Sequence, residues 1–173
     1  PAEKIKRETG VLFISYDTLK GGEQVAATDK GQKQGKTRLE QISEWLGPEF
    51  DGVIIFDESH KMGNLLPSKG KRGKKDPAMK AIAGSELQDQ FPLARFGYFS
   101  ATGATEVTNL AYAKRLGLWG EQTAFQNVQE FIGAITEAGI STMELVARDL
   151  KQLGLYVSRS LSFKGVTYNR LTH

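Results

Sequence analysis

The sequence predicts an α/β fold, in which a mainly parallel sheet with flanking helices is followed by a helix-rich C-terminal part. Short, almost continuously apolar runs alternate with amphipathic segments over the first two thirds of the chain. Such runs are typical of parallel strands that are buried on both faces. Capping residues mark the amphipathic segments as helices. After Gly117 the helical pattern dominates.

Three apolar runs are predicted to be strands. Residues 11–16 (VLFISY) are β-branched and aromatic and stop at an aspartate. Residues 53–56 (VIIF) and 96–99 (FGYF) have the same character, and both are followed by small or polar residues. Aliphatic and aromatic runs of this length, bounded by turn residues, favour buried strands. Residues 155–157 and 166–168 are weaker strand candidates.

Five helices are predicted from their caps and apolar spacing. Thr37 and Glu40 form a capping box for the first, which Gly47 ends. The other four are expected to open at Asp76–Pro77, to cover 106–116, to open at Asn127 with Glu130, and to open at Ser141 with Glu144. The apolar face of the second carries Met79, Ile82, Ala83 and Leu87, and that of the fifth carries Met143, Val146, Leu150 and Leu153.

Composition narrows the classes of protein. The chain has 173 residues, of which 39% are hydrophobic and 25% charged, as expected for one globular domain. Its apolar runs are much shorter than the roughly 20 residues of a membrane-spanning helix, so no membrane contact is predicted. With Cys 0 and His 2, a disulfide framework or a cysteine or histidine zinc site is excluded. The chain opens at Pro1 without an initiator Met, and we interpret it as a piece of a longer protein.

Positive charge is concentrated in one loop. The net charge of +3 is 23 Lys and Arg minus 20 Asp and Glu. Residues 69–75 (KGKRGKK) carry five of those positives, so the rest of the chain has 3 − 5 = −2. The surrounding stretch 64–76 is the best candidate for a mobile loop. Lys71 and Arg72 are its candidate contacts with nucleic-acid phosphates, and the alternative is a solvated charged surface.

The most informative residues are Asp57-Glu58-Ser59-His60, which directly follow the predicted strand 53–56. Ligands of open α/β sheets bind beyond the carboxyl ends of the strands, so both carboxylates should face a cleft. An Asp there can hold Mg²⁺ through water, and the next Glu can orient or deprotonate the water that attacks a γ-phosphate. The alternative is that the two acids only solvate the end of a strand.

Ser100-Ala101-Thr102 follow the predicted strand 96–99 in the same way. Their hydroxyls can hydrogen-bond the acidic site and transmit its state to a neighbouring element. By itself the tripeptide is common and can be a turn or a helix cap. Together with Asp57–His60, however, it resembles in order and approximate spacing motifs II and III of superfamily two helicases.

The chain as a whole resembles the strawberry notch family. The stretches that carry this resemblance are 10–19 (GVLFISYDTL), 37–47 (TRLEQISEWLG), 50–61 (FDGVIIFDESHK), 92–106 (PLARFGYFSATGATE), 115–121 (RLGLWGE), 143–147 (MELVA) and 161–168 (LSFKGVTY). The later stretches are more specific to the family than the helicase motifs are. Two departures are Ser59, where relatives commonly have Cys, and the expanded basic loop 69–75.

The resemblance implies part of the first RecA-like lobe of a DExH-type helicase. Residues 1–116 would be the C-terminal part of this lobe, and 117–173 a helical, family-specific extension toward the second lobe. ATP and Mg²⁺ are the implied cofactors. In eukaryotes the family is known as transcriptional co-regulators. In bacteria, phages and plasmids, related helicase regions occur beside DNA-methylase domains.

The resemblance also implies roles for individual residues. Asp57 would hold the Mg²⁺ of Mg-ATP, Glu58 would be the catalytic base or the water-positioning group, and His60 would couple nucleotide state to the nucleic-acid groove. Ser15 and Tyr16 match the position where such helicases contact the nucleic-acid backbone. A hydroxyl and an aromatic face suit that contact, although Tyr16 could equally pack in the core.

A phosphate-binding loop is expected upstream of Pro1. Residues 31–37 (GQKQGKT) resemble such a loop superficially, but only three residues separate the glycines, where the pattern needs four. No strand is predicted before them, since 25–30 is a polar stretch. Thr37 is better explained as a helix N-cap. The chain would therefore carry half of an ATP site and be inactive alone.

The leading hypothesis is thus that the chain is part of a DNA-dependent ATPase motor. Its expected partners are DNA and a second lobe of the same chain, and a methyltransferase domain or transcription factors are further candidates. The main alternative is a catalytically silent, helicase-like scaffold. A methyltransferase is excluded because no (N/D)PP(Y/F/W) tetrapeptide is present. The expected location is the cytoplasm if the source is prokaryotic or a phage, which we favour, and the nucleus if it is eukaryotic. We also expect exposed sheet edges and self-association of the isolated piece.

Overall fold

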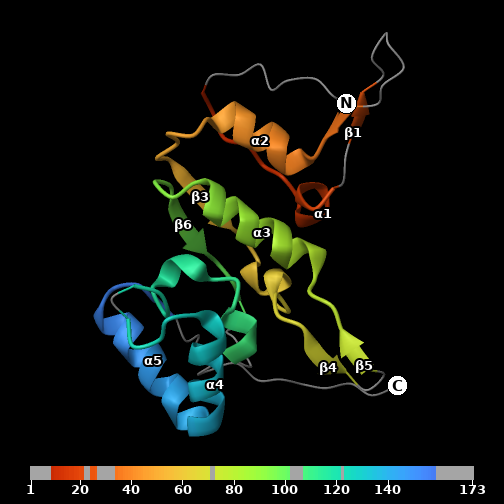
Figure 1. Ribbon diagram of the computed structural model, residues 1–173. Coiled ribbons are helices and arrows are strands. Elements are labelled where there is room, and N and C mark those ends of the chain that lie inside the picture. Colours follow the sequence, from red (N-terminus) through yellow and green to blue (C-terminus); the bar gives the residue numbers. More distant parts are fainter. Residues whose placement is uncertain are drawn as a thin grey trace, which may run out of the picture.

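The computed structural model describes residues 9–21, 24–26, 34–70, 73–101, 107–121 and 123–158 (Figure 1). The helices are α1 Tyr16–Leu19, α2 Arg38–Leu46, α3 Met79–Gln90, α4 Val128–Ala138 and α5 Ile140–Gln152, with short 3₁₀ helices η1 Ser59–Met62, η2 Val107–Leu110 and η3 Lys114–Leu116. The strands are β1 Gln24–Ala26, β2 Gln34–Lys36, β3 Val53–Phe56, β4 Ser68–Gly70, β5 Gly73–Lys75 and β6 Arg95–Tyr98.

A parallel pair of strands, β3 and β6, forms the centre of the fold and confirms the α/β class. Val53 lies opposite Arg95, and Phe56 lies opposite Tyr98. Residues on alternate positions of a strand face opposite sides. Ile54 and Phe56 accordingly pack toward α2 and α3, which cover one face of the pair. Parallel pairing brings the carboxyl ends of both strands to the same edge.

The expectation that helices cover both faces of the sheet is not met in the described part of the chain. Val53 and Ile55 are 62% and 60% exposed, and Phe99 just beyond β6 is 56% exposed. A β-carbon added at Gly97 would lie 3.0 Å from the Phe99 ring and 3.8 Å from Ile55, so these residues share one face. We call Val53, Ile55 and Phe99 the open face.

The predicted strand over 11–16 is wrong. Residues 11–15 have no strand partner among the described residues, Val11 and Phe13 are 80% and 90% exposed, and Tyr16 already belongs to α1. One physical cause is visible, because the Ser15 hydroxyl accepts a hydrogen bond from the Thr18 amide at 3.1 Å and so caps a helix. A groove of about 780 Å³ lies between these residues, α2 and β3.

Two hairpins replace segments that were expected to be loops. Strands β1 and β2 pair antiparallel, with Val25 opposite Gly35. Strands β4 and β5 pair in the same way inside the predicted mobile loop, with Ser68 opposite Lys75. Lys71 and Arg72, between β4 and β5, lie outside the described residues.

The predicted caps are confirmed for α2 and α4. Thr37 makes the expected capping box with Glu40, and the Asn127 side chain accepts a hydrogen bond from the Glu130 amide at 2.9 Å. Helix α5 begins at Ile140 rather than at Ser141, because the φ of +84° at Gly139 ends α4 and leads directly into α5.

Two other helices differ from expectation. Helix α3 begins at Met79, after the Ala78 amide donates to the Asn64 carbonyl at 2.9 Å, and Met79 itself is 61% exposed. The helix predicted over 106–116 is two short 3₁₀ turns, η2 and η3. Between them the Tyr112 carbonyl accepts a hydrogen bond from the side chain of Gln88, which interrupts a continuous helix.

Two apolar clusters hold the molecule together. The larger unites α1, α2, α3 and the β3–β6 pair. The smaller lies around Phe131 and Ile135 of α4, with Met143, Val146 and Leu150 of α5 packed on it. Leu116 packs against both clusters. The α4–α5 pair lies at the end of the molecule opposite α2 (Figure 1).

No strand is present at 155–157, whereas 166–168 lies outside the described residues. Among the helices that the structure describes, none has the length and apolar character to cross a membrane.

Candidate functional site

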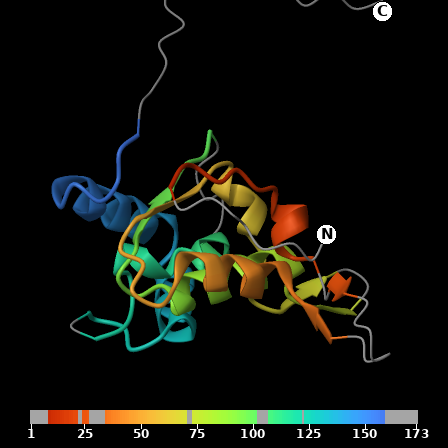
Figure 2. The same ribbon diagram turned by 90° about the horizontal axis from the view of Figure 1, so that it is seen from above.

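The acidic turn, Asp57-Glu58-Ser59-His60, lies at the carboxyl end of β3, as predicted. The ladder continues past both strands, because the Phe99 amide donates to the Phe56 carbonyl at 2.9 Å and the Ser59 amide donates to the Phe99 carbonyl at 2.8 Å. These two hydrogen bonds bring the acidic turn beside the segment that follows β6. Seen from above, the residues before α1 approach the same side of the molecule (Figure 2).

Glu58 has a left-handed backbone conformation, with φ 49° and ψ 46°. A non-glycine residue in this region carries a strain of about 1–3 kcal/mol and persists only where neighbouring contacts hold it. Its amide donates to the Asp57 Oδ1 at 3.0 Å. The main-chain and side-chain bonds around the turn therefore impose a conformation that an isolated peptide would avoid.

His60 joins the two predicted motifs. Its Nδ1 lies 2.9 Å from the Ser100 Oγ and 3.2 Å from the Glu58 Oε2. The sequence separates His60 from Ser100 by forty residues, yet the parallel strands bring them into contact. A proton on Nδ1 can be directed to either oxygen, so the imidazole sits between the acidic turn and the segment after β6.

The Glu58 Oε2 is shielded from solvent and accepts no hydrogen bond within the described part of the chain. A buried carboxylate oxygen of this kind is costly unless a water, a protonated group or a ligand satisfies it. His60 Nδ1 at 3.2 Å is the nearest such group when the imidazole is protonated. The imidazole is thus placed to satisfy this oxygen.

Two phenols hold the acidic turn from opposite sides. The Tyr16 hydroxyl donates to the Asp57 carbonyl at 2.7 Å, and the Tyr112 hydroxyl donates to the Ser59 Oγ at 3.1 Å. Burial raises the pKa of Tyr16 to about 12 and also raises the pKa of Tyr112. Both hydroxyls therefore stay protonated, and remain donors, at neutral pH.

Tyr112 belongs to a buried chain of hydrogen bonds that the sequence did not reveal. Gln88, 1% exposed, donates from Nε2 to the Tyr112 carbonyl at 2.8 Å and accepts from the Tyr98 hydroxyl. The Tyr98 hydroxyl in turn accepts from the Arg115 amide at 3.2 Å. No spacing rule pairs these residues, since the contacts arise only when α3, β6 and the 3₁₀ turns pack together.

The donor set around the acidic turn fits Mg²⁺ held through water better than Mg²⁺ held directly. Asp57 offers an exposed carboxylate, and oxygen ligands are what this cation prefers. No group of three or more His, Cys, Asp or Glu side chains converges within the described ranges. A single carboxylate suits an ion whose other ligands are waters and phosphate oxygens.

Two of the four residues predicted to contact nucleic acid, Ser15 and Tyr16, line the same groove as Asp57 of the acidic turn. Ser15 is exposed and caps α1. The Tyr16 ring stacks on Phe56 with centroids 6.4 Å apart, so the core-packing alternative describes its position. Ala101 is exposed just beyond Ser100, whereas Thr102 lies outside the described residues.

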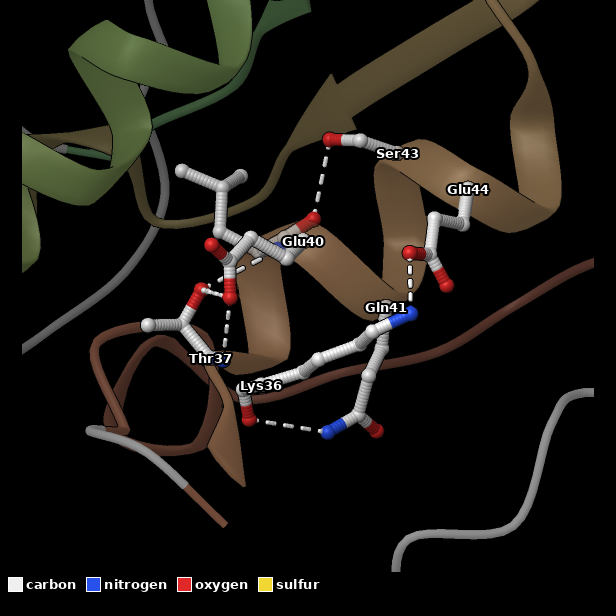
Figure 3. Close-up of polar contacts among 7 residues, drawn as sticks. Lys36, Thr37, Glu40, Gln41, Ser43 and Glu44 are labelled. Carbon is white, nitrogen blue, oxygen red and sulfur yellow. Dashed lines mark hydrogen bonds and ion pairs between the residues drawn. The ribbon is translucent and has the colours of Figure 1, made fainter. Parts of the chain in front are cut away.

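The structure also explains the stretch that resembles a phosphate loop. The Thr37 Oγ1 accepts from the Glu40 amide at 3.2 Å, and the Glu40 carboxylate accepts from the Thr37 amide at 2.6 Å. The Lys36 ammonium pairs with Glu44 (Figure 3). In the described part of this stretch, the lysine and threonine are thus engaged in starting α2, as predicted for Thr37.

Comparison with known proteins assigns the class of protein. The family described as P-loop containing NTP hydrolase pore-1 matches residues 2–173. The chain therefore belongs to this family of P-loop NTP hydrolases. No solved structure matches the chain significantly.

The particular relatives are strawberry notch proteins. The chain is 47% identical over 159 residues to human protein strawberry notch homolog 1, and 45% identical over 161 residues to strawberry notch of Drosophila melanogaster. It is 44% identical over 159 residues to protein FORGETTER 1 of Arabidopsis thaliana. Each match covers 92% of this chain but only 11%, 9% and 11% of these relatives, so the chain spans about a tenth of their length. The strawberry notch resemblance is confirmed.

Proposed function

We propose that this chain contributes the hydrolytic half of an ATP-driven DExH-type motor that moves on DNA. The observation that carries the proposal is the convergence of Glu58, His60 and Ser100 at the common carboxyl edge of β3 and β6. Membership of a P-loop NTP hydrolase family supports nucleotide hydrolysis as the reaction class. The motor activity, the nucleic acid and the residue roles are our proposal.

Mg-ATP supplies the γ-phosphoryl group and the metal charge that stabilises it. Asp57 holds the ion through water, because its exposed carboxylate is the hard-oxygen ligand at this edge. Glu58 orients the attacking water and accepts its proton, because its side chain is 44% exposed at this edge while His60 holds its Oε2. His60 and Ser100 sense this change, because the imidazole Nδ1 lies between the Glu58 carboxylate and the Ser100 hydroxyl.

The proposed motor needs further parts, and the chain spans only about a tenth of the length of its relatives. The phosphate-binding loop and a second lobe with a transition-state arginine would come from the same polypeptide, so the 173-residue chain alone should be inactive. DNA is the proposed track, with Ser15, Lys71 and Arg72 as phosphate contacts. A methyltransferase domain or transcription factors are proposed neighbours. Such a motor would act where the DNA is, in the prokaryotic cytoplasm or the eukaryotic nucleus.

The test is steady-state ATP hydrolysis by the full-length protein, with and without single-stranded DNA, beside its Glu58→Gln variant. We expect DNA to stimulate the wild type and Glu58→Gln to lose activity by about 10²–10⁴-fold. Glu137→Gln, the same change at an exposed position of α4, is the matched control and should behave as the wild type. If the wild type neither binds nor hydrolyses nucleotide, the proposal fails and the silent-scaffold alternative takes its place.

A further inference from the structure

Tyr16 connects the segment in front of α1 to the acidic turn. It is the first residue of α1, directly after the N-cap Ser15. Its hydroxyl donates to the Asp57 carbonyl at 2.7 Å, across forty-one residues of sequence. Its ring stacks on Phe56, the last residue of β3. One side chain thus contacts both the end of the strand and the start of the turn.

The accepting atom determines what this contact can do. The Asp57 carbonyl and the Glu58 amide belong to the same peptide plane, which is rigid. Tyr16 binds the oxygen of this plane, and the Asp57 Oδ1 binds its N–H at 3.0 Å. A rotation of the plane would therefore move the Asp57 carboxylate and change the left-handed φ of Glu58 together.

The strained turn needs such a restraint. Glu58 at φ 49° and ψ 46° returns to an ordinary conformation unless its flanking groups are fixed. On the Ser59 side, the Ser59 amide donates to the Phe99 carbonyl at 2.8 Å, and the Tyr112 hydroxyl donates to the Ser59 Oγ at 3.1 Å. On the Asp57 side, the Tyr16 hydroxyl donates to the Asp57 carbonyl and the Asp57 Oδ1 accepts from the Glu58 amide.

A movement of helix α1 would move the Tyr16 hydroxyl, because Tyr16 belongs to this helix. It is a single turn, and Asp17 attaches it to α3 through an ion pair with Lys80 at 3.3 Å. Ser15, at its start, is exposed. A ligand that binds in front of α1 and shifts it will therefore shift the phenol that holds the Asp57–Glu58 peptide.

We propose that Tyr16 is a positioning residue, whose hydroxyl makes the orientation of the Asp57 and Glu58 carboxylates depend on nucleic acid bound in front of α1. The inference rests on the proposed function, and it replaces base stacking by Tyr16 with a mechanical role. It predicts that the hydroxyl matters for stimulation by nucleic acid more than for hydrolysis itself.

The experiment compares Tyr16→Phe with Tyr112→Phe in the full-length protein. Each variant removes one phenolic hydroxyl from the same turn and keeps the ring. The readouts are basal kcat, KM for ATP, and the ratio of stimulated to basal kcat with single-stranded DNA. Thermal unfolding within about 3 °C of the wild type shows that each variant is folded.

We expect Tyr16→Phe to lower the DNA-stimulated kcat more than the basal kcat, so that the stimulation ratio falls about three- to tenfold, the range that one hydrogen bond supports. Tyr112→Phe should change basal and stimulated rates by a common factor, so that the ratio stays constant. Hydrogen exchange of the Glu58 amide gives a second readout. DNA should slow this exchange in the wild type and leave it unchanged in Tyr16→Phe.

The failures are distinguishable. A wild type that lacks hydrolysis refutes the proposed function and the inference with it. A stimulated wild type whose Tyr16→Phe variant keeps the full ratio refutes the inference alone. Equal losses of ratio in Tyr16→Phe and Tyr112→Phe would also overturn it, because they would show a common structural role for the two phenols.

Discussion

The side chains that hold the acidic turn in place could not be identified from the sequence, whereas the charged residues of the turn could. The acidic pair and His60 were predicted from their place after an apolar strand, and the structure puts them at its carboxyl end. The phenols of Tyr16 and Tyr112, which hold the turn, follow no motif spacing. They meet the turn only because α1 and the 3₁₀ turns pack beside it. The positions of the charged residues could therefore be predicted from the sequence, and the tyrosines that hydrogen-bond the turn could not.

Two half-buried phenols make the stability of the protein depend on pH in the alkaline range. Burial raises the pKa of Tyr16 and of Tyr98 from 10.0 to about 12. Below pH 10 both phenols are protonated in the folded and unfolded chain, so their contribution is complete. Between about pH 10 and 12 the unfolded chain releases these protons first, and the free energy of unfolding falls.

We expect Tyr98→Phe to show a shallower decline of the free energy of unfolding over this range than the wild type. The comparison uses the slope with pH, since the variant also loses hydrogen bonds to Gln88 and Arg115. Chemical denaturation at a series of pH values measures it. Parallel slopes for the two proteins would show that the Tyr98 phenol ionises equally easily in both states.

Close packing of elements positions the acidic turn as firmly as hydrogen bonds do. Helix α3 lies against η1, the 3₁₀ turn that contains Ser59 and His60 of the acidic turn. Met62 of η1 is fully buried over Gly84 of α3. The absence of a side chain at Gly84 therefore lets the turn approach the helix.

Gly84→Ala is expected to destabilise the protein by about 1–3 kcal/mol. The added β-carbon would lie 2.4 Å from the Met62 Sδ, and because Met62 is fully buried, its side chain would have to shift against the core. Gly133→Ala in α4 is the matched control. Nothing lies within 4 Å of its β-carbon, so the better helix propensity of alanine should raise stability by about 0.5–1 kcal/mol.

Denaturant unfolding measures the stability of both variants, and equal effects of the same sign would contradict the packing account.

Local caps explain why elements such as α2 and α4 were predictable: Thr37 and Asn127 act within one turn of chain. Residues 11–16 show the limit. Their composition favours a strand, but a strand also needs a neighbour, and a groove lies between these residues and β3.

At the scale of the whole molecule, an uncovered apolar surface remains. The open face of Val53, Ile55 and Phe99 is exposed, and Val11 and Phe13 expose further apolar area beside the groove. Contiguous exposed apolar patches mark surfaces that another element or chain covers. The α/β class was predictable from apolar periodicity, whereas this open face depends on which strands and helices are neighbours in space.

We expect the 173-residue chain by itself to self-associate through the open face. Light scattering should give a mass above the 19.0 kDa of one chain. Ile55→Thr combined with Phe99→Ser should shift the mass toward the monomer, since the changes remove exposed apolar area. Leu145→Thr, at a 47% exposed position of α5, is the control and should not. A clean wild-type monomer at high concentration would contradict this prediction.

The most direct test of the central claim, that Glu58 in the acidic turn activates the attacking water, is single-turnover hydrolysis of pre-bound ATP in the full-length protein. The account predicts that Glu58→Gln binds ATP with the affinity of the wild type and hydrolyses it about 10²–10⁴-fold more slowly. A Glu58→Gln protein that hydrolyses bound ATP at the wild-type rate would contradict the account.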